Sequence, residues 1–384
     1  MVAVRFTNPF RYGDLALDEA FTDREAEIAE LTSDITNGQN VVIFAPRRYG
    51  KSSLMWRVAQ ECVARGDVLI AQVNLMQTPT KEQLAERLAA SIYENIASRL
   101  VRARERLRIC RGLRLTPTIT IDPHDGSPTF GFEASARRED IDATLERLFE
   151  LPAKLAADRQ ARVALAFDEF QEIVDIDPRL PDLMRSIFQE QPEVAHVYLG
   201  SRHTMMAKIF NDENEPFWRS AKQMELGVIP ADLFRPFVRS RFEATGRGLA
   251  DDVLARVLDV TRGHPYGTQE LCYAIWEVTP ESSVADAAAF EAGLDRVLRG
   301  ENSHFGRVWE KASRGQRTTL LALAKEPLRP MDDGYRRRHK LPAPSTVQKA
   351  LQTLVEDELV VKERPGDYRI AEPFLMEWIL RHEA

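Results

Sequence analysis

The segment VVIFAPRRYGKSSL (41–54) carries the residues whose types and spacing point most directly to chemistry. Gly50, Lys51 and Ser52 follow a short apolar run and open an amphipathic stretch. Glycine lets the backbone curl so that its N–H groups face phosphate oxygens, and a helix that begins at Lys51 directs its positive end at the same anion. Lys51 can reach the β and γ phosphates, and Ser52 can offer its hydroxyl to Mg²⁺. The segment therefore predicts a phosphate loop that binds ATP with Mg²⁺.

The segments on either side of this motif support the prediction of nucleotide binding more strongly than the motif itself does. Gly-Lys-Ser/Thr alone arises by chance in roughly one chain in five of this length. Ala45 also stands where the first glycine of G-x-x-x-x-G-K-[ST] is expected. Its position between a buried strand and an amphipathic helix favours the nucleotide-binding interpretation. Arg47 and Arg48 could face phosphate or solvent, and we favour phosphate only for Arg48. The candidate loop residues are Ala45, Pro46, Arg47, Arg48, Tyr49, Gly50, Lys51, Ser52 and Ser53.

A pair of carboxylates ends the apolar run of VALAFDEFQEI (163–173). Strands of this type present side chains at the carboxyl edge of a parallel sheet, where ligands of open α/β folds bind. Asp168 is suited to holding Mg²⁺, and Glu169 to polarising an attacking water. The alternative is that both are solvated carboxylates at the start of a loop. The preceding phosphate loop favours the functional interpretation.

A polar group also ends the apolar run 194–201, where Gly200 is followed by Ser201 and Arg202. If this run is a neighbouring strand, Ser201 or Arg202 would lie beside the γ-phosphate and could sense its loss. The alternative is that Ser201 only caps the following helix.

Five short apolar runs alternate with helical patterns, which predicts an α/β fold: a P-loop NTPase parallel sheet with helices on both faces. The expected strands are 41–45, 68–75, 163–169, 194–201 and 224–229. The expected helices include one within 21–35 that follows a cap at Thr22 or Asp23, and 51–64, 80–108 and 138–158. An inserted β-hairpin is expected within about 112–135, because Thr116 to Glu133 alternates and contains Asp-Gly and Ser-Pro.

After Pro230 the pattern of apolar residues becomes that of amphipathic helices, and a further pattern of helices and a hairpin follows near the C-terminus. We therefore predict three domains. The first, 1–230, holds the phosphate loop. The second, 231–305, is a helical lid whose patterns break at Gly263-His264-Pro265 and at Gly300. The third, 306–384, has three helices, a hairpin turning at Pro365-Gly366 and a last helix, which describes a winged helix.

The amino-acid composition excludes some classes of function and favours others. The chain has 384 residues, 44% of them hydrophobic, and a net charge of −7. This mildly acidic balance argues against a protein that coats nucleic acid through charge alone. Three widely spaced cysteines fit a reducing compartment. The sequence has neither a signal-peptide pattern nor an apolar run of membrane-spanning length, so the expected location is the cytoplasm, with no membrane.

Several segments together resemble the archaeal-type ATPase family, which groups with the STAND branch of AAA+ P-loop NTPases. The likeness runs from about Asn8 to the C-terminus. It rests on five segments: FTDREAEIAEL, APRRYGKSSL, AFDEFQEI, YLGSRHTMMAKIF and TRGHPYGTQELC.

The resemblance implies roles for particular residues. Ala45 to Ser52 match the Walker A loop, Asp168-Glu169 the Walker B and Ser201-Arg202 the sensor-1 strand end. Phe21 and Arg24 match a segment that packs near the adenine, although Asp23 stands where glycine is usual. His264-Pro265 matches a lid element whose proline lies against the nucleotide. The same residues could also simply end one helix and start another, and both interpretations can hold together.

The resemblance also implies a switch. Relatives of the STAND type hold a closed state with ADP, and exchange for ATP opens them toward assembly. We therefore expect an unidentified protein partner and oligomerisation in the ATP state. No separate arginine finger is recognisable.

Two alternatives to this switch stay open. Arginines 336–338, Lys340, Lys362 and Arg364 could contact DNA phosphates from a winged helix. Against this, the predicted second helix (346–359) carries Glu356, Asp357 and Glu358. The other alternative is a nucleotide-binding scaffold that never hydrolyses ATP; Glu169 argues against it, and Ala45 keeps it open.

Overall fold

The computed structural model describes residues 7–13, 21–97, 116–121, 128–133, 138–201 and 203–383. The chain divides into two compact units. We call Arg24–Arg47 together with Lys51–Leu226 the sheet unit, and Met1–Asp23, Arg48–Gly50 and Gly227–Ala384 the helical unit. Each is described by itself.

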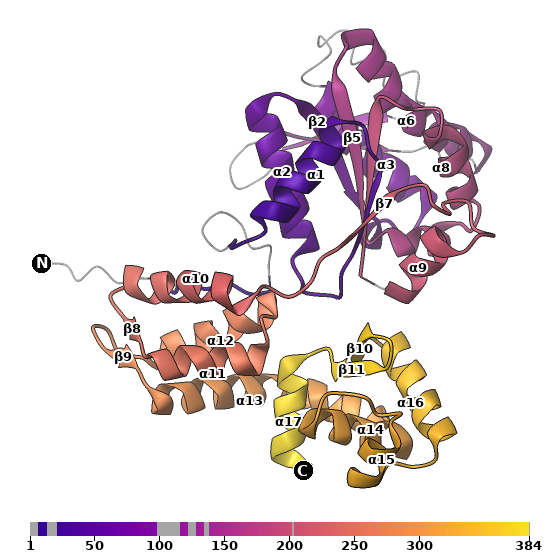
Figure 1. Ribbon diagram of the computed structural model, residues 1–384. Helices are drawn as coiled ribbons and strands as arrows, with labels where there is room; N and C mark the ends of the chain where they lie inside the picture. The colour runs from indigo at the N-terminus through magenta and orange to yellow at the C-terminus, as the bar shows by residue number, and fades with distance from the viewer. Residues whose placement is uncertain are drawn as a thin grey trace, which may run out of the picture. The chain divides into compact units, whose positions relative to one another are not determined.

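A five-stranded, fully parallel sheet forms the centre of the sheet unit, which confirms the predicted fold class (Figure 1). Its order is β2-β5-β6-β1-β7. The strands are β1 (Val41–Phe44), β2 (Val68–Asn74), β5 (Arg162–Asp168), β6 (Val194–Gly200) and β7 (Lys222–Glu225). Strand β7 is shifted from the predicted 224–229, because it is an edge strand with mostly exposed side chains and the apolar run beyond Glu225 lies outside it. Strands β1 and β6 are buried along their whole length. Such strands need apolar side chains toward both faces, which explains the uninterrupted apolar runs.

Helices cover both faces of this sheet. Val42 and Phe44 of β1 point into a core shared with α3 (Lys81–Ile92), α6 (Arg138–Arg159) and α8 (Leu180–Phe188). Because side chains alternate along a strand, Val41 and Ile43 face the other side. There α1 (Glu25–Thr36) and α2 (Lys51–Arg65) pack against each other and against β6 and β2 (Figure 1). The remaining short elements are η2 (Leu75–Gln77), η3 (Tyr93–Ala97), η4 (Phe170–Glu172), α7 (Ile173–Ile176) and α9 (His203–Asn211).

Two helix boundaries differ from the predictions. Helix α1 begins at Glu25, slightly later than the Thr22/Asp23 cap predicts, because Asp23 and Arg24 adopt left-handed backbone conformations with φ of 57° and 79°. Helix α3 ends at Ile92 and continues as the π-helical turn η3, and the rest of the predicted helix 80–108 lies outside the described residues. The predicted hairpin is confirmed as β3 (Thr116–Ile121) paired antiparallel with β4 (Pro128–Glu133); the rest of the segment 112–135 lies outside the described residues.

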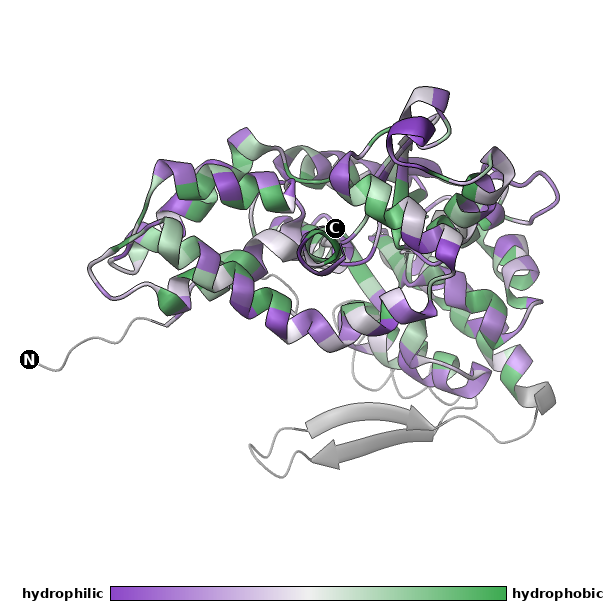
Figure 2. Cartoon of the chain, turned by 90° about the horizontal axis from the view of Figure 1, so that it is seen from below, coloured by the Kyte–Doolittle hydropathy of each residue, from purple (hydrophilic) through white to green (hydrophobic). Residues whose placement is uncertain are grey.

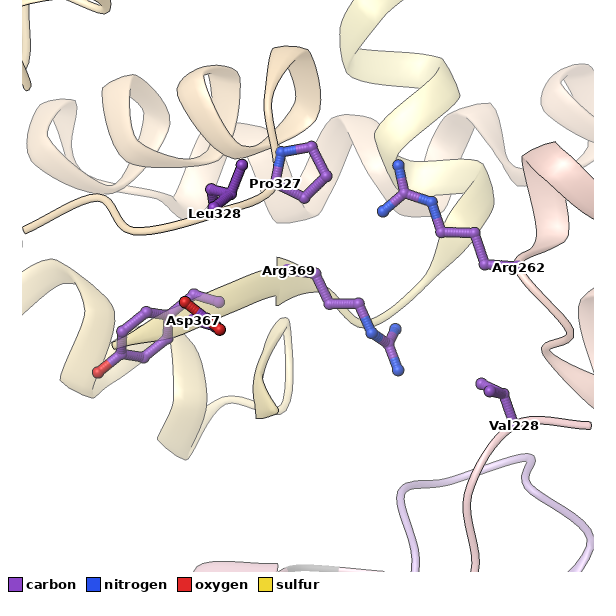
Figure 3. Close-up of a pocket in the computed structure, with 7 residues that line it drawn as sticks. Val228, Arg262, Pro327, Leu328, Asp367 and Arg369 are labelled. Carbon is purple, nitrogen blue, oxygen red and sulfur yellow. The ribbon is translucent and has the colours of Figure 1, made fainter. Parts of the chain in front are cut away.

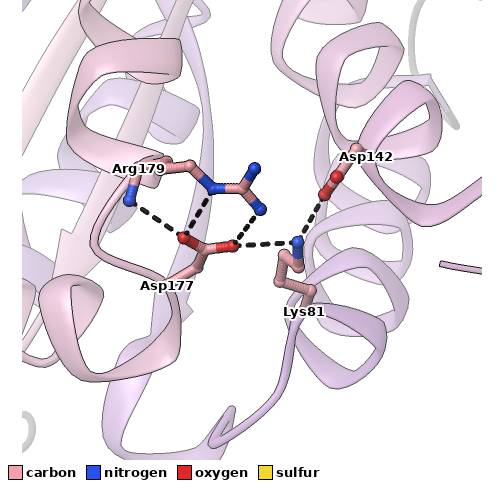
Figure 4. Close-up of polar contacts among 4 residues, drawn as sticks. All are labelled: Lys81, Asp142, Asp177 and Arg179. Carbon is pink, nitrogen blue, oxygen red and sulfur yellow. Dashed lines mark hydrogen bonds and ion pairs between the residues drawn. The ribbon is translucent and has the colours of Figure 1, made fainter. Parts of the chain in front are cut away.

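A polar network at Lys81 joins separate parts of the sheet unit (Figure 4). The Lys81 ammonium lies 2.5 Å from Asp142 of α6 and 2.9 Å from Asp177, which follows α7. Arg179 pairs with the same Asp177 carboxylate, and its hydrogen bonds, together with those from Lys81, hold the pKa of Asp177 well below its usual range. The start of α3 is thereby tied to α6 and to the segment that leads into α8.

The helical unit has one continuous hydrophobic core. Its first helices are α10 (Ala231–Ala244), α11 (Asp251–Thr261), α12 (Pro265–Val278) and α13 (Ala287–Lys311), with the two-residue strands β8 (Gly248–Leu249) and β9 (Val284–Ala285). Phe10, from the start of the chain, is buried in this core against Phe242. Figure 2 shows the helices banded in hydrophobic and hydrophilic residues, as expected where one face is buried.

The predicted break at Gly300 is wrong, because α13 runs through it to Lys311. A glycine inside a helix costs about 1 kcal/mol relative to alanine. Here α13 buries Phe290, Leu294 and Phe305 on one side, and this burial outweighs the cost. The same helix crosses the predicted boundary between 305 and 306.

The last part of the helical unit has the predicted order of three helices, a hairpin and a helix. The helices are α14 (Arg314–Lys325), α15 (Asp333–Arg338) and α16 (Pro344–Glu356). The hairpin pairs β10 (Val360–Arg364) with β11 (Asp367–Ile370), and α17 (Pro373–His382) follows. Gly366, with φ of 92°, makes the turn. Among the described residues no helix is long and apolar enough to cross a membrane.

Candidate functional site

Three chain segments with candidate residues leave the sheet at one edge. Strand β6 lies between β1 and β5, with Phe44 opposite Gly200 and Phe167 opposite Tyr198. All three strands are parallel, so the phosphate loop after β1, Ser201 after β6 and Asp168 at the end of β5 emerge at their carboxyl ends. This edge is where open α/β sheets bind ligands.

Lys51 is the first residue of α2 and is only 5% exposed. Its ammonium donates to the backbone carbonyls of Ala45, at 3.0 Å, and Pro46, at 3.2 Å. A buried ammonium needs such acceptors, because leaving its charge unpaired away from water is costly. The carbonyls of the loop therefore hold the lysine beside the backbone that would surround a phosphate. Ser53, the next buried polar residue of α2, faces the interior.

Ser52 and Asp168 meet across the sheet edge. The Ser52 hydroxyl donates to Asp168 Oδ2 at 2.6 Å, and Asp168 Oδ1 accepts from the backbone N–H of Glu169 at 3.0 Å. Burial raises the pKa of Asp168, Glu169 acts in the same direction, and the Ser52 hydrogen bond and the Lys51 charge oppose them. A hydroxyl that donates its proton keeps two lone pairs. The pair thus presents the oxygen ligands that Mg²⁺ prefers.

Glu169 is held by two side-chain donors. Its Oε2 accepts from Gln171 Nε2 at 2.6 Å and from the Ser201 hydroxyl at 2.8 Å. Glu169 has a left-handed backbone, with φ of 53°, and this turn brings the fully buried Gln171 back toward the carboxylate. Ser201 therefore contacts Glu169 through its side chain. Gln171 is not among the residues predicted from the sequence; the only signal for it is its position two residues after Glu169.

The residues expected near an adenine precede α1. Arg24 is buried at the amino end of α1, and its guanidinium pairs with Glu27 at 2.8 Å. Phe21 is half-buried in the segment before it. Asp23, which replaces the usual glycine, takes a left-handed conformation that glycine would adopt more easily.

The tip of the predicted phosphate loop belongs to the helical unit. Arg48–Gly50 group with residues 227–384, whereas Arg47, which is exposed, and Lys51 belong to the sheet unit. Arg48 and Gly50 have φ of 67° and 85°. A Cβ at position 50 would meet no atom within 4 Å, so glycine is favoured there by backbone conformation and not by space.

Two aromatic side chains and two charged side chains of the helical unit contact Arg48 and Tyr49 of the phosphate loop. Tyr49 is buried, with its ring edge-on to His264 at 4.8 Å between centroids. The Arg48 guanidinium lies 4.3 Å from the centre of the Tyr266 ring and 3.5 Å from Glu372 Oε2. The Tyr49 hydroxyl accepts a hydrogen bond from Arg369 at 2.9 Å.

His264 caps α12, and Pro265 occupies the first turn of that helix. The Nδ1 atom of His264 accepts from the N–H of Gly267 at 3.1 Å. Burial lowers the pKa of His264 to about 3, and the charges of Arg369 and Arg48 add to this, so the ring is neutral. Gly263 before it approaches Ile229 so closely that a Cβ would lie 2.1 Å from the Ile229 carbonyl oxygen. The helix stop and restart expected here are thus confirmed.

Two carboxylates, Glu270 and Glu372, interact with the charge of Arg48, and Glu301 acts on both of them. Burial raises the pKa of Glu270 to about 8, with Glu301 and Glu372 acting in the same direction and Arg48 opposing them. The pKa of Glu372 is also raised, mainly by burial. Glu270 is therefore protonated in the folded chain near neutral pH and ionised in the unfolded chain.

A Glu270→Gln variant is expected to make the helical unit less sensitive to alkaline pH. Because the folded chain binds this proton more tightly, wild-type stability falls as pH rises from about 4.5 to about 8. Relative to wild type, the variant should gain about 4 kcal/mol in free energy of unfolding between pH 5 and pH 8.5. Urea unfolding at both pH values measures this gain. An equal difference between variant and wild type at both pH values would contradict it.

Among the described residues, no group of three or more His, Cys, Asp or Glu side chains could hold a metal by itself. Ser52 and Asp168 are thus the protein oxygens brought together here, and nucleotide phosphates and water would supply the other ligands of Mg²⁺. Arg202, the other predicted sensor residue, lies outside the described residues.

Comparisons with known proteins agree with this architecture. No functionally curated protein matches the sequence. The chain is similar in structure to a Walker-type ATPase of Pyrococcus abyssi, with 17% identity, 95% of this chain and 97% of that chain covered and a TM-score of 0.65. It is also similar to the ORC1 protein of Aeropyrum pernix in complex with DNA, with 15% identity, 98% of both chains and a TM-score of 0.49. Only the first TM-score exceeds 0.5, and at this identity it bears on the fold alone.

Two family descriptions match the sequence. Residues 303–381 match a family described as "probable winged helix domain", which agrees with the order of α14 to α17. Residues 21–271 match the family described as "ATPase domain predominantly from Archaea", which spans the phosphate loop, Asp168-Glu169, Ser201 and His264-Pro265. The chain therefore belongs to this archaeal-type ATPase family and carries a C-terminal winged helix.

Proposed function

We propose that this chain binds ATP with Mg²⁺ at the sheet edge and hydrolyses it slowly, as a nucleotide-dependent switch of the STAND type. The observation that carries the proposal is the meeting of Lys51, Ser52 and Asp168 at the carboxyl ends of parallel strands. These are a cation for phosphate oxygens, a hydroxyl and a carboxylate for Mg²⁺, and the amino end of α2 for the same anion. The archaeal-type ATPase family supports the same assignment.

Each residue has a definite part in the proposed reaction. Lys51 and the backbone of the loop bind the β and γ phosphates, and Ser52 and Asp168 would hold Mg²⁺, which neutralises charge on the phosphates when bound. Glu169 orients and polarises the attacking water, while Gln171 and Ser201 hold its carboxylate in place. Arg24 and Phe21 are proposed to lie near the adenine, and Pro265 against the nucleotide. Arg202 is proposed as a sensor.

The division into domains, the two nucleotide states and the cellular location are proposed on the same basis. We keep 1–230, 231–305 and 306–384 as the domains, with α13 crossing the second boundary. ADP would hold one state, and ATP would favour an assembled state with a protein partner. A reducing cytoplasm suits Cys62 and Cys272, whose thiols are both buried and free.

Titration calorimetry of Mg-ATP and Mg-ADP tests this function directly. Binding of both nucleotides, with slow release of phosphate from ATP, is the expected result. A folded protein that takes up neither nucleotide in the presence of Mg²⁺ would refute the proposal.

DNA binding by the winged helix is a second candidate, favoured by the surface of α16. The helix ends at Glu356, so the sequence-based objection is partly wrong: Asp357 caps it, and Glu358 lies beyond it with φ of 59°. The outward positions of its first turns carry Ser345, Thr346, Gln348, Lys349 and Gln352, which are all exposed. Recognition helices contact bases through such residues. Against this, Arg336 and Arg338 are already paired with Asp333 and Glu326.

The DNA-binding candidate predicts a gel shift of duplex DNA at low salt that weakens steeply as salt is raised. Lys349→Ala should weaken the shift, and Lys222→Ala, on β7 of the sheet unit, serves as the charge-matched control. No shift with either ATP or ADP present would reject this candidate.

A further inference from the structure

One exposed face of α13 carries arginines without acidic neighbours. Arg296, Arg299 and Arg307 are all exposed, and none of them forms an ion pair with a described residue. Residues at these spacings lie on one side of an α-helix, which has 3.6 residues per turn. Glu301, the only acidic residue between Arg296 and Arg307, is half-buried and lies on the opposite side, where it acts on the pKa of Glu270. We call the three arginines the α13 arginine strip.

Other arginines of the helical unit are balanced by carboxylates of the chain itself. The net charge of the protein is −7, so acidic side chains are plentiful. Five arginines of this unit are paired with Asp or Glu: Arg239, Arg256, Arg329, Arg338 and Arg381. The α13 arginine strip differs from them, because its positive charge is left for an external anion to balance.

The cavity beside β11 is a weaker candidate for an anion site (Figure 3). Arg262 and Arg369 line it, and its volume is about 250 Å³. Arg369 already donates a hydrogen bond to the Tyr49 hydroxyl at 2.9 Å, and Asp367 places a carboxylate in the same wall. An anion in this cavity would have to displace a contact and approach a negative charge. Binding to the exposed guanidinium groups of the α13 arginine strip requires neither.

An exposed aromatic ring lies beside the strip. Tyr12 is 40% exposed, and its ring makes edge contacts with Tyr266 and Tyr273 of α12, at 5.7 and 5.3 Å between centroids. Burial raises the pKa of Tyr12, Glu270 acts in the same direction and Arg296 opposes them, so Arg296 is a neighbour of this ring. The two tyrosines of α12 hold the ring in place and leave part of it open to solvent. An unpaired base can stack on such a ring.

We propose that the α13 arginine strip and Tyr12 bind a single strand of nucleic acid, with phosphates on the arginines and a base stacked on the ring. From Arg296 to Arg307 the strip spans about 17 Å along the helix axis, which is long enough for several phosphates. Between the arginines, Gly300 and Ser303 are exposed and small, so a strand can approach the helix closely. The Ser303 hydroxyl can donate to a phosphate. This surface is separate from the nucleotide site at the sheet edge and from the exposed face of α16.

A single strand fits these observations better than other polyanions do. An acidic protein could pair with the arginines, but it has no need of an exposed ring beside them. Duplex DNA could also pair with them, but its bases are stacked on each other and are not free to stack on Tyr12. A single strand offers both phosphates and free base faces. Basic groups along the backbone with aromatic rings for the bases are typical of proteins that bind such strands.

Fluorescence anisotropy with a labelled oligothymidylate of about 15 nucleotides tests the strip. The triple variant Arg296→Gln, Arg299→Gln, Arg307→Gln should bind the strand at least about tenfold more weakly than wild type at low salt. The slope of log affinity against log salt should fall by about two, because each phosphate contact to a single strand contributes about 0.7. The matched control removes the same charge from paired arginines of the same unit and should bind as wild type does: Arg239→Gln, Arg256→Gln, Arg329→Gln.

Variants of Tyr12 test the stacked base. Tyr12→Ala should weaken binding of the same strand by about five- to a hundredfold, which is the range measured for stacking on aromatic side chains. Tyr12→Phe keeps a ring and should bind as wild type does. A duplex of the same length should bind less tightly and should not respond to Tyr12→Ala. Circular dichroism with thermal unfolding checks that each variant is folded.

The outcomes separate this proposal from its alternatives. Binding of either oligothymidylate or an oligouridylate of the same length supports it, and the tighter one identifies DNA or RNA as the source. No binding of either strand by folded wild type, or undiminished binding by the strip variant, would overturn it. An equal loss in the control triple variant would do the same, since it shows an effect of net charge. Polyglutamate that binds as tightly as the strand, or a duplex that does so without regard to Tyr12, would also reject a single-strand site.

Discussion

Glu169→Gln is expected to bind Mg-ATP with wild-type affinity and to lose its hydrolysis almost completely. Glutamine has nearly the same shape, and its carbonyl oxygen can still accept from Gln171 and Ser201, so the local structure should survive. It cannot accept a proton from an attacking water. A positioned general base contributes about 10²- to 10⁴-fold to a rate, and the loss should fall in that range. Calorimetry gives the affinity, and phosphate release under single-turnover conditions gives the rate.

The matched control for this variant is Glu190→Gln, an exposed glutamate just after α8. It removes the same charge from the sheet unit and should hydrolyse ATP at the wild-type rate. Hydrolysis by Glu169→Gln within threefold of the control would refute the role of Glu169. A matching loss of affinity would instead indicate that Glu169 supports binding.

Ser201 offers a graded test of the same geometry. Ser201→Ala removes one of the two donors to Glu169, and Ser201→Thr restores a hydroxyl. If Ser201 positions the carboxylate, Ser201→Ala should reduce the single-turnover rate about tenfold with little change in affinity, and Ser201→Thr should recover most of the rate. A purely structural role would reduce folded protein and affinity together.

Four of the five strands could be predicted, because a buried strand must be apolar; the mostly exposed edge strand β7 was misplaced by two residues at its start. Strand β1, buried on both faces, must be apolar at every position, and VVIF satisfies this requirement within four residues. Alternation of such runs with amphipathic helices then determines the class of fold, and the family match confirms it. Asp168 and Ser52 could be placed at one edge for the same reason, since parallel strands end on the same side.

Features that depend on unusual backbone conformations or on contacts between distant residues were harder to predict from the sequence. Asp23 and Arg24 are not glycines, so their residue types did not predict left-handed backbones before α1; the only signal was that Asp23 stands where the family usually has glycine. Gly300 suggested a helix end, but the apolar face of α13 continues through it. Gln171 reaches Glu169 only because the chain turns between them. The contacts of Tyr49 with Arg369 join residues 320 positions apart, which one sequence cannot reveal.

Lys51→Ala is expected to abolish measurable nucleotide binding while leaving the sheet unit folded. The variant removes the ammonium that would face the β and γ phosphates and that now bonds the carbonyls of Ala45 and Pro46. Hydrogen bonds to charged groups contribute about 1.5–3 kcal/mol each, so losing this lysine should weaken Mg-ATP binding by about 10²-fold or more. Calorimetry measures the affinity, and circular dichroism with thermal unfolding measures the fold.

The cost of this change to folding should be small, because removing the lysine also removes the need to bury its charge. The Ala45 and Pro46 carbonyls lose a donor, but water can replace it at the half-exposed Pro46. Lys222→Ala is the control, since Lys222 is paired in register with Val41, at the end of β1 opposite the phosphate loop. It should bind Mg-ATP as wild type does. Unchanged affinity in Lys51→Ala would show that the helix N-terminus and loop amides alone hold the phosphates, and the assignment of Lys51 would be wrong.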